Sequence, residues 1–195
     1  MRCWRVLLFL FVLVVQGVAA FVSIPGGLAR LSVSDSPSSF RTKGWLSAIK
    51  VTIRIVGRKN SERWIEDGCE MYLKRLKPAN VDLVTEWHKS NEALIKGVQS
   101  DWDKNVPVVL LDPKGKKSSS EKFSSEFYRL VEQGGSRLVY VIGGAEGLPE
   151  ELRSNGKTKL FSLSDLTFTH QFARLLLIEQ IYRASEIRKG SGYHK

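Results

Sequence analysis

Two adjacent glycines follow an apolar run in the stretch VIGGAEGLPEEL (141–152), and glycine lets a ligand approach the backbone closely. The order Gly143-Gly144-x-x-Gly147 differs from the G-x-G-x-x-G pattern of dinucleotide-binding loops, and no Gly-Lys-Ser/Thr sequence follows it. Glu146, inside the loop, would repel a polyphosphate. The loop therefore favours a flat or hydroxylated ligand without phosphate, and a tight turn that binds nothing is the alternative.

Two further segments carry polar groups to the ends of predicted strands. LLDPKG puts Leu111 and Asp112 at the end of a second apolar run, and LSDLTFTH (163–170) offers hydroxyl groups and backbone just before a helical stretch. If these runs are parallel strands, their carboxyl ends meet at one edge of the sheet, where ligands bind in open α/β folds. Three such loops together predict a pocket at that edge.

Four residues towards the C-terminus could supply acid–base or charge chemistry: His170, Arg183, Tyr193 and His194. His170 could instead cap the helix that it begins, and Arg183 could hold a phosphate or form an internal ion pair. Tyr193 and His194 belong to the terminal GYHK, and terminal residues are often idle. The histidines are far apart, no HExxH occurs, and Cys69 is the single cysteine after residue 45, so the sequence predicts no metal site and no disulfide there.

Strand-like and helical stretches alternate from residue 49 onward and would position these loops. Apolar runs predict strands at 49–57, 81–87, 107–112, 137–144 and 159–164, and DPKGKKSSS (112–120) predicts a turn and loop. Helical spacing predicts helices at 61–76 with Ser61 as N-cap, and at 90–104, 120–134, 148–156 and 170–190. The alternation predicts an α/β fold: a parallel-rich sheet with helices on both faces.

The last predicted helix has more apolar surface than one stripe would need. Either both of its sides are buried in the core, or part of it packs against a second subunit. The apolar positions are Phe172, Leu175, Leu176, Leu177, Ile178, Ile181 and Tyr182.

The first 45 residues have the composition of a targeting presequence. Residues 1–20 join two arginines to an apolar run that ends in small residues, as in a secretory signal peptide. Residues 21–45 are rich in Ser, Arg and Gly, as in an organelle transit peptide. Together they resemble the two-part presequence of algae with secondary plastids. We expect a plastid protein with one domain at 46–195 and no membrane association of that domain; mitochondrial import, secretion or an uncleaved anchor are the alternatives.

The chain is basic, with 30 Lys and Arg against 20 Asp and Glu. Five of the basic residues and one acidic residue lie in 1–45, which leaves a net charge of +6 for the domain. This charge suits a nucleic-acid partner without requiring one. The basic clusters are Arg58, Lys59 and Arg63; Lys74, Arg75 and Lys77; and Lys114, Lys116 and Lys117. The third cluster borders the predicted pocket and could meet phosphate, whereas solvated surface is the simpler interpretation of the other two.

Three motifs resemble one known family. YVIGGAEGL, FSLSDLTFTHQFARLLLIEQIYRA and the terminal GYHK are similar to the RlmH family, SPOUT-class methyltransferases that modify N3 of a pseudouridine in large-subunit ribosomal RNA. The resemblance covers about 49–195 and is tightest from Val108 onward. It implies a trefoil-knotted α/β fold, S-adenosylmethionine as the cofactor, ribosomal RNA as the partner, and a homodimer.

The resemblance also assigns site residues by position. The implied cofactor pocket consists of Leu111, Gly143, Gly144, Leu163, Ser164, Asp165, Leu166, Thr167 and Phe168. The tail is implied to fold over this pocket, so Tyr193 and His194 would recognise the target base, with His170 and Arg183 as further catalytic candidates. Thr169 stands where many relatives have Pro, which could loosen the loop.

Two functions agree with the sequence. The first is an enzyme that methylates N3 of a pseudouridine in the large-subunit RNA of organellar ribosomes. The second is a ribosome-assembly or rRNA-binding factor that has lost catalysis. The intact GYHK tail favours the enzyme.

Overall fold

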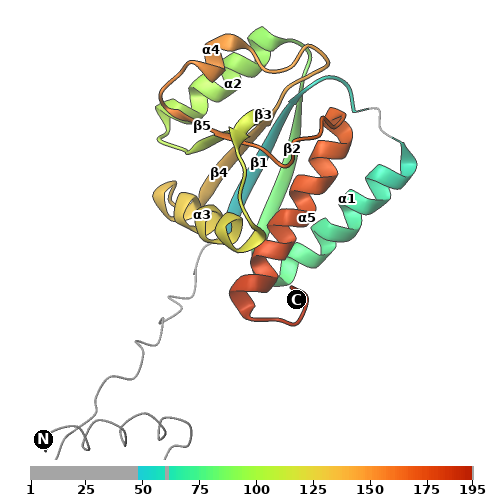
Figure 1. Cartoon of the computed structure of the whole chain (residues 1–195). Helices are drawn as coiled ribbons and strands as arrows, with labels where there is room; N and C mark the ends of the chain where they lie inside the picture. Colours follow the sequence, from blue (N-terminus) through green and yellow to red (C-terminus); the bar gives the residue numbers. More distant parts are fainter. Residues whose placement is uncertain (1–47, 60–61, 195) are drawn as a thin grey trace, which may run out of the picture. The chain divides into compact units, whose positions relative to one another are not determined.

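A five-stranded parallel sheet forms the centre of the computed structural model, which describes residues 48–59 and 62–194 (Figure 1). The strands are β1 (Ile49–Val56), β2 (Val81–His88), β3 (Val108–Lys116), β4 (Arg137–Ile142) and β5 (Thr158–Phe161). Their order across the sheet is β2-β1-β4-β3-β5, and each neighbouring pair is parallel. The predicted parallel sheet is confirmed.

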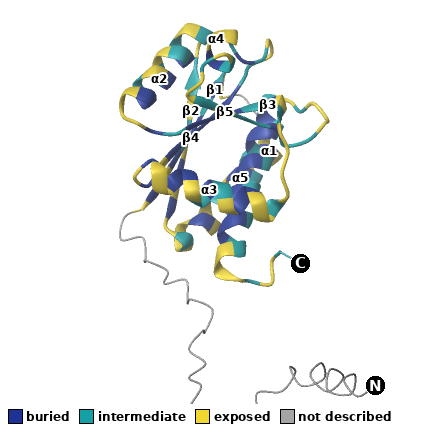
Figure 2. Cartoon of the chain, turned by 60° about the vertical axis from the view of Figure 1, so that its left-hand side comes forward, coloured by how far each residue is buried: buried dark blue, intermediate teal, exposed yellow. Residues whose placement is uncertain are grey.

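Helices cover both faces of the sheet, as predicted (Figures 1 and 2). One face packs against α1 (Arg63–Leu76), α3 (Ser120–Gln133) and α5 (His170–Lys189). The other packs against α2 (Asn91–Asp103) and α4 (Glu150–Arg153). A short 3₁₀ helix, η1 (Lys77–Ala79), joins α1 to β2. The protein is therefore an α/β fold with a three-layer arrangement.

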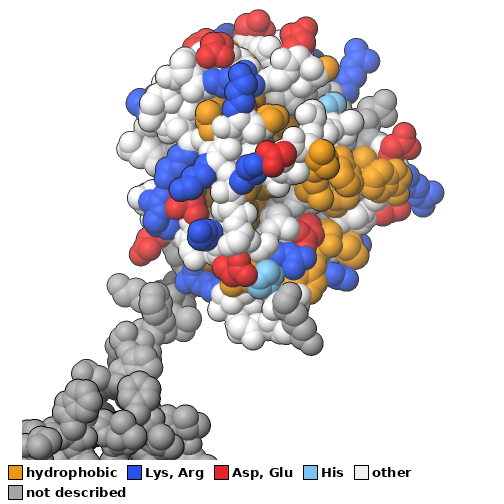
Figure 3. Space-filling model, viewed as in Figure 1, with side chains coloured by type: hydrophobic (Ala, Val, Ile, Leu, Met, Phe, Trp, Pro, Cys, Tyr) orange, Lys and Arg blue, Asp and Glu red, His pale blue; other side chains and the backbone are white. Residues whose placement is uncertain are grey.

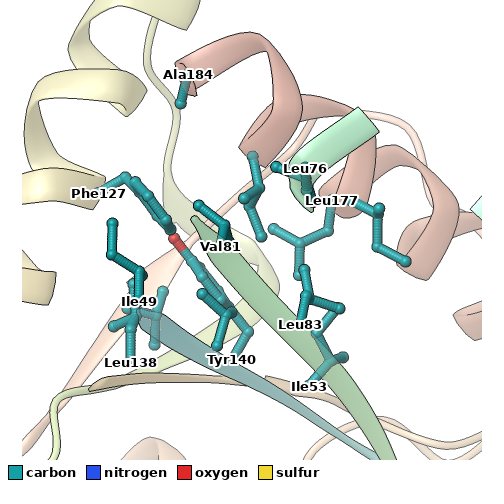
Figure 4. Packing of buried hydrophobic residues seen from close by; sticks show 14 of the residues in the cluster. Ile49, Ile53, Leu76, Val81, Leu83, Phe127, Leu138, Tyr140, Leu177 and Ala184 are labelled. Atoms are coloured by element: carbon teal, nitrogen blue, oxygen red, sulfur yellow. The ribbon is translucent and has the colours of Figure 1, made fainter. Parts of the chain in front are cut away.

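The core shows why the central strands are continuously apolar. All residues of β4 after Arg137 are buried, because β4 has helices over both faces. Leu138 and Tyr140 belong to the cluster under α1, α3 and α5, whereas Val139 belongs to the cluster under α2 and α4. Figure 4 shows Tyr140 pointing towards Phe127 of α3, within the larger cluster.

The strand β3 is longer than the sequence predicts. It continues to Lys116 through the segment that we assigned to a loop, so that assignment was wrong for 112–116. Its pairing with β5 shifts between Leu111 and Lys116, both of which pair with Phe161. A Cβ on Gly115 would lie 2.6 Å from the backbone nitrogen of Phe161, so the backbones of the two segments are in direct contact. Gly115 is required because no side chain fits between them.

Some predictions fall outside the described residues or beyond what the fold shows. The presequence at 1–45 and the proposed N-cap Ser61 lie outside the described residues. The trefoil knot stays a prediction from the resemblance. Within 48–59 and 62–194, none of the helices has both the length and the apolar character needed to cross a membrane.

Candidate functional site

A cavity of about 550 Å³ lies beside the middle of β3 and the carboxyl ends of β4 and β5. Its volume is within the range of small-molecule sites. Of the nine residues predicted for the cofactor, eight line it: Leu111, Gly143, Gly144, Leu163, Ser164, Leu166, Thr167 and Phe168. Asp165 is not in the lining; its carboxylate forms an exposed ion pair with Lys117, with an oxygen 2.5 Å from Nζ. The three predicted segments therefore do converge on one cavity, although 111–113 lie within β3 rather than in a loop, and their role in binding a cofactor stays a prediction.

The glycines of the 143–147 loop form a tight turn. A Cβ on Gly143 would collide with the backbone of Gly147, which itself has a φ of +83°. The amide of Gly147 donates to the carbonyl of Gly144 at 3.0 Å. A Cβ on Gly144 would meet Val56 of β1 at 3.3 Å, so it points away from open space. The turn itself demands glycine, and it also forms one wall of the cavity.

Two charged residues that we did not predict as site residues also line the cavity. Asp112, whose side chain is 2 % exposed, lies with Oδ2 2.7 Å from Nε of Arg153 in α4. The two buried atoms form an ion pair, but their geometry is not that of a hydrogen bond. Neither atom has a hydrogen-bond partner among the described residues. The Arg153 side chain is 31 % exposed, so its guanidinium can still reach an anionic ligand group. The strand-end position of Asp112 was its sequence signal; Arg153 had none.

The loop before α5 is held by its own hydroxyl groups. Ser162 Oγ donates to the Ser164 carbonyl at 2.7 Å, and Ser164 Oγ accepts from the amide of Leu166 at 3.1 Å. Thr169 is the N-cap of α5, because its Oγ1 accepts from the amide of Phe172 at 3.3 Å. Thr169 thus fastens the loop to the helix.

His170 is the first residue of α5, and it lines the cavity. Its ring meets the edge of Trp87 at a centroid distance of 6.4 Å. The capping alternative for His170 is wrong, since Thr169 provides the cap. Among the described residues, His170 is the histidine that lines the cavity.

Comparison with known proteins identifies the family. Residues 49–194 match the model of a family described as "Predicted SPOUT methyltransferase". This chain belongs to the SPOUT methyltransferase family. The resemblance inferred from the three sequence motifs is thereby confirmed.

Three relatives of this SPOUT domain are each named Ribosomal RNA large subunit methyltransferase H. The protein of Protochlamydia amoebophila is 50% identical over 147 residues, covering 75% of this chain and 99% of its own. That of Halothermothrix orenii is 38% identical over 167 residues, covering 75% and 100%. That of Prochlorococcus marinus (strain MIT 9211) is 37% identical over 137 residues, covering 70% and 90%. The relatives thus match almost their full length.

The C-terminal tail of the SPOUT domain lies far along α5 from the cavity. Helix α5 begins at the cavity with His170 and has 20 residues, which corresponds to about 30 Å. The tail turns back to the middle of this helix, where the Tyr193 hydroxyl donates to Glu179 at 3.2 Å, nine residues or about 14 Å along the helix from His170. His194 Nε2 lies 2.7 Å from a carboxylate oxygen of Glu121 in α3. One SPOUT chain therefore does not bring Tyr193 and His194 together with His170.

Arg183 belongs to the tail cluster rather than to the cavity. Its guanidinium contacts Glu179 at 2.7 and 3.1 Å, and lies 4.9 Å from the centre of the Tyr193 ring. Its Nη1 is 3.4 Å from Nδ1 of His194. The internal ion pair that we gave as an alternative for Arg183 is confirmed, and this arginine anchors both tail residues.

The charge environment fixes the protonation of two groups beside the tail. Burial, together with hydrogen bonds to Tyr72 and Glu179, raises the pKa of Tyr193 to about 12, so its phenol is protonated at neutral pH. Hydrogen bonds from Ser119 and then His194 lower the pKa of Glu121 to about 2. Tyr193 thus offers a hydrogen-bond donor, and Glu121 offers His194 a carboxylate.

In the described part of this SPOUT chain, no three His, Cys, Asp or Glu side chains are grouped as metal ligands.

Proposed function

We propose that the protein transfers the methyl group of S-adenosylmethionine to N3 of a pseudouridine in large-subunit ribosomal RNA. Its family and the names of its relatives support a ribosomal RNA methyltransferase. The observation that carries the proposal is the cavity, because three segments far apart in sequence meet there, and two of them are loops at the carboxyl ends of parallel strands.

The cavity suits the proposed cofactor. Its walls are mainly apolar side chains with backbone of the 143–147 and 162–169 loops, which would hold a nucleoside. Arg153, kept in place by Asp112, is the cationic group that would bind the carboxylate of the methionine part. When bound, S-adenosylmethionine supplies an electrophilic methyl group. The protein's contribution to such a displacement is chiefly to align the two reactants.

The target nitrogen must lose a proton before or during transfer, and the cavity wall contains one candidate to accept it. His170 borders the cavity beside Thr169 and Ala173. A neutral imidazole has a ring nitrogen that can accept a proton as a general base. Tyr193 would act as a hydrogen-bond donor to the target base, since its phenol is protonated. We assign His194 to positioning of the base.

The site is completed in a homodimer, in which the tail of one chain reaches the cavity of the other. The tail contacts Glu179 and Glu121 rather than the cavity of its own chain, and Leu166, which lines that cavity, is 69 % exposed. Trp64 of α1 is 57 % exposed, and its ring lies 6.1 Å from that of Phe172 in α5. Met71 of α1 is 39 % exposed. Figure 3 shows hydrophobic side chains gathered on this side of the molecule, as expected of an interface.

The proposed place of action is the plastid ribosome, reached through the presequence at 1–45. A fusion of residues 1–45 to a fluorescent protein, expressed in an alga with a secondary plastid, tests this part. Fluorescence inside the plastid supports it. Fluorescence in mitochondria or along the secretory pathway contradicts it.

Transfer of label tests the activity. The full chain is incubated with radiolabelled S-adenosylmethionine and with pseudouridine-containing ribosomes that lack the methyl group, and free rRNA is tested in parallel. We expect label in the large-subunit RNA of ribosomes. Cofactor binding without any transfer to either RNA would favour the assembly-factor alternative.

A further inference from the structure

A second and larger cavity, of about 920 Å³, lies under α3 beside β3 and β5. Its interior is apolar: Phe123, Phe127 and Leu130 come from α3, and Tyr140 and Phe161 come from the sheet. The rings of Phe123 and Phe161 are 5.3 Å apart. This volume and lining would accommodate an aromatic group.

The rim of this cavity is strongly basic. Lys116, Lys117, Lys122 and Lys159 line it, against Glu126 as the one acid in the lining. Lys117 pairs with Asp165, and Lys159 pairs with Glu126 at 2.8 Å. Lys116 and Lys122 form no ion pair within the described residues. Figure 3 shows Lys and Arg side chains gathered over α3 and β5. An aromatic interior with a cationic rim matches a base attached to phosphates.

The second cavity lies next to the first, where the end of β3 contacts the segment that follows β5. The amide of Ser162 donates to the carbonyl of Lys116 at 3.2 Å, and the Lys117–Asp165 ion pair holds the same two segments together. Ser162 lines the first cavity, whereas Lys116 and Lys117 line the second. A ligand in the second cavity therefore lies directly beside the loop that forms the proposed cofactor site.

The tail also ends beside this rim. His194 contacts Glu121, the residue before Lys122. The rim and the tail residues thus form one continuous surface at the start of α3.

We infer that the second cavity binds an unpaired nucleotide of the substrate RNA, with its base in the apolar interior and its phosphates at Lys116 and Lys122. This inference rests on the proposed function, and it identifies an RNA-contacting site that is separate from the cofactor cavity. Contacts to phosphate release counterions, so the affinity must fall as the salt concentration rises. The slope of log affinity against log salt is proportional to the number of such contacts.

The test measures binding of a labelled 12-residue oligouridylate to the full chain over a series of KCl concentrations. The double variant Lys116→Ala/Lys122→Ala should reduce the slope of log affinity against log salt by about 1.4, or about 0.7 for each phosphate that a lysine no longer neutralises. Lys96→Ala, on the exposed side of α2, is the matched control and should leave the slope unchanged. An unchanged slope in the double variant, or no binding by the parent chain, would overturn the inference.

The base is tested with an abasic oligomer of the same length and charge. If the apolar interior binds a base, the abasic oligomer should bind at least about fivefold more weakly, because stacking contributes about 1–3 kcal/mol per base. Equal affinities would overturn this part. Binding of S-adenosylmethionine by the same variants separates the two claims. Normal cofactor binding with an unaltered salt slope would refute RNA binding at the second cavity alone. No cofactor binding by the parent chain would refute the proposed function.

Discussion

At the scale of single residues, Ala145 gives the most direct access to the proposed cofactor cavity. It is exposed, it borders the cavity, and it lies between Gly144 and Gly147. Gly144 itself is a poor probe, because a larger side chain there would collide with Val56 before it reached the cavity. A bulky side chain at 145 can occupy the cavity without disturbing the core.

We expect Ala145→Trp to weaken binding of S-adenosylmethionine at least tenfold in calorimetry, since the indole takes space that the ligand needs. Glu146→Trp is the matched control: the neighbouring residue is also exposed but does not line the cavity. Equal affinities of the two variants would show that the cofactor binds elsewhere.

A second feature at this scale is the ionic cluster around Arg54 of β1, on the face of the sheet that packs against α2. Arg54 Nε lies 2.7 Å from Asp101, and its Nη1 lies 3.3 Å from Nε2 of His88. Burial and then the charge of Arg54 lower the pKa of His88. His88 is therefore held neutral in the folded protein and takes up a proton more readily when unfolded.

This shift has a definite sign for stability. A lowered pKa in the folded state gives stability that is present above the unfolded pKa of about 6.5 and is lost as pH falls below it. The free energy of unfolding should therefore decrease from pH 7 to pH 5, and His88→Gln should make that decrease shallower by at most about 1.4 kcal/mol per pH unit. Urea unfolding at several pH values measures both. Identical pH dependence in parent and variant would exclude His88 as the cause.

At the scale of elements, the start of α5 links the fold to the site. Thr169 caps the helix, and the next residue, His170, lines the cavity. Loss of the cap would loosen the 162–169 loop, which forms one wall of the cavity. The φ of Thr169, −61°, is also one that proline adopts.

We expect Thr169→Ala to lower the free energy of unfolding by about 1 kcal/mol, the usual cost of removing an N-cap hydroxyl. Thr169→Ser keeps the hydroxyl and should retain most of the stability. Chemical denaturation of the three proteins provides the comparison. A Ser variant as unstable as the Ala variant would show that the cap hydroxyl is not responsible.

The elements also show what sequence patterns can and cannot predict. The run 137–144 predicted a buried strand, which the structure shows at 137–142, and the parallel sheet followed from alternation with helices. The run 112–116 predicts a loop because Asp, Pro, Gly and Lys disfavour strands. In the structure, however, Lys116 pairs with Phe161 of β5, which is far away in the sequence. Arg153 could not be predicted, since its pairing with Asp112 joins α4 to β3. Local patterns carry no information on such contacts.

At the scale of the whole molecule, the separation of tail and cavity leads to a test of the dimer. Dimers are prepared from one chain with Ala145→Trp and one chain lacking residues 193–195. If the tail of each chain serves the other chain's cavity, such a mixed dimer contains one complete site and should have about half of the parent's activity.

Each variant alone should be inactive as a homodimer. A mixed dimer that is equally inactive would mean that cavity and tail must belong to the same chain. Sedimentation of the parent gives the oligomeric state independently, and a monomer at working concentration would also contradict the shared site.

The most direct test of the whole account is the chemical identity of the product. Ribosomes that carry the unmethylated pseudouridine are treated with the full chain and S-adenosylmethionine, and the nucleosides of the large-subunit RNA are separated and weighed by mass spectrometry. We predict 3-methylpseudouridine from the parent chain and from Glu146→Trp, and little or none from Ala145→Trp. A methyl group on a different nucleoside, or no methylated product although the cofactor binds, would contradict the proposed function.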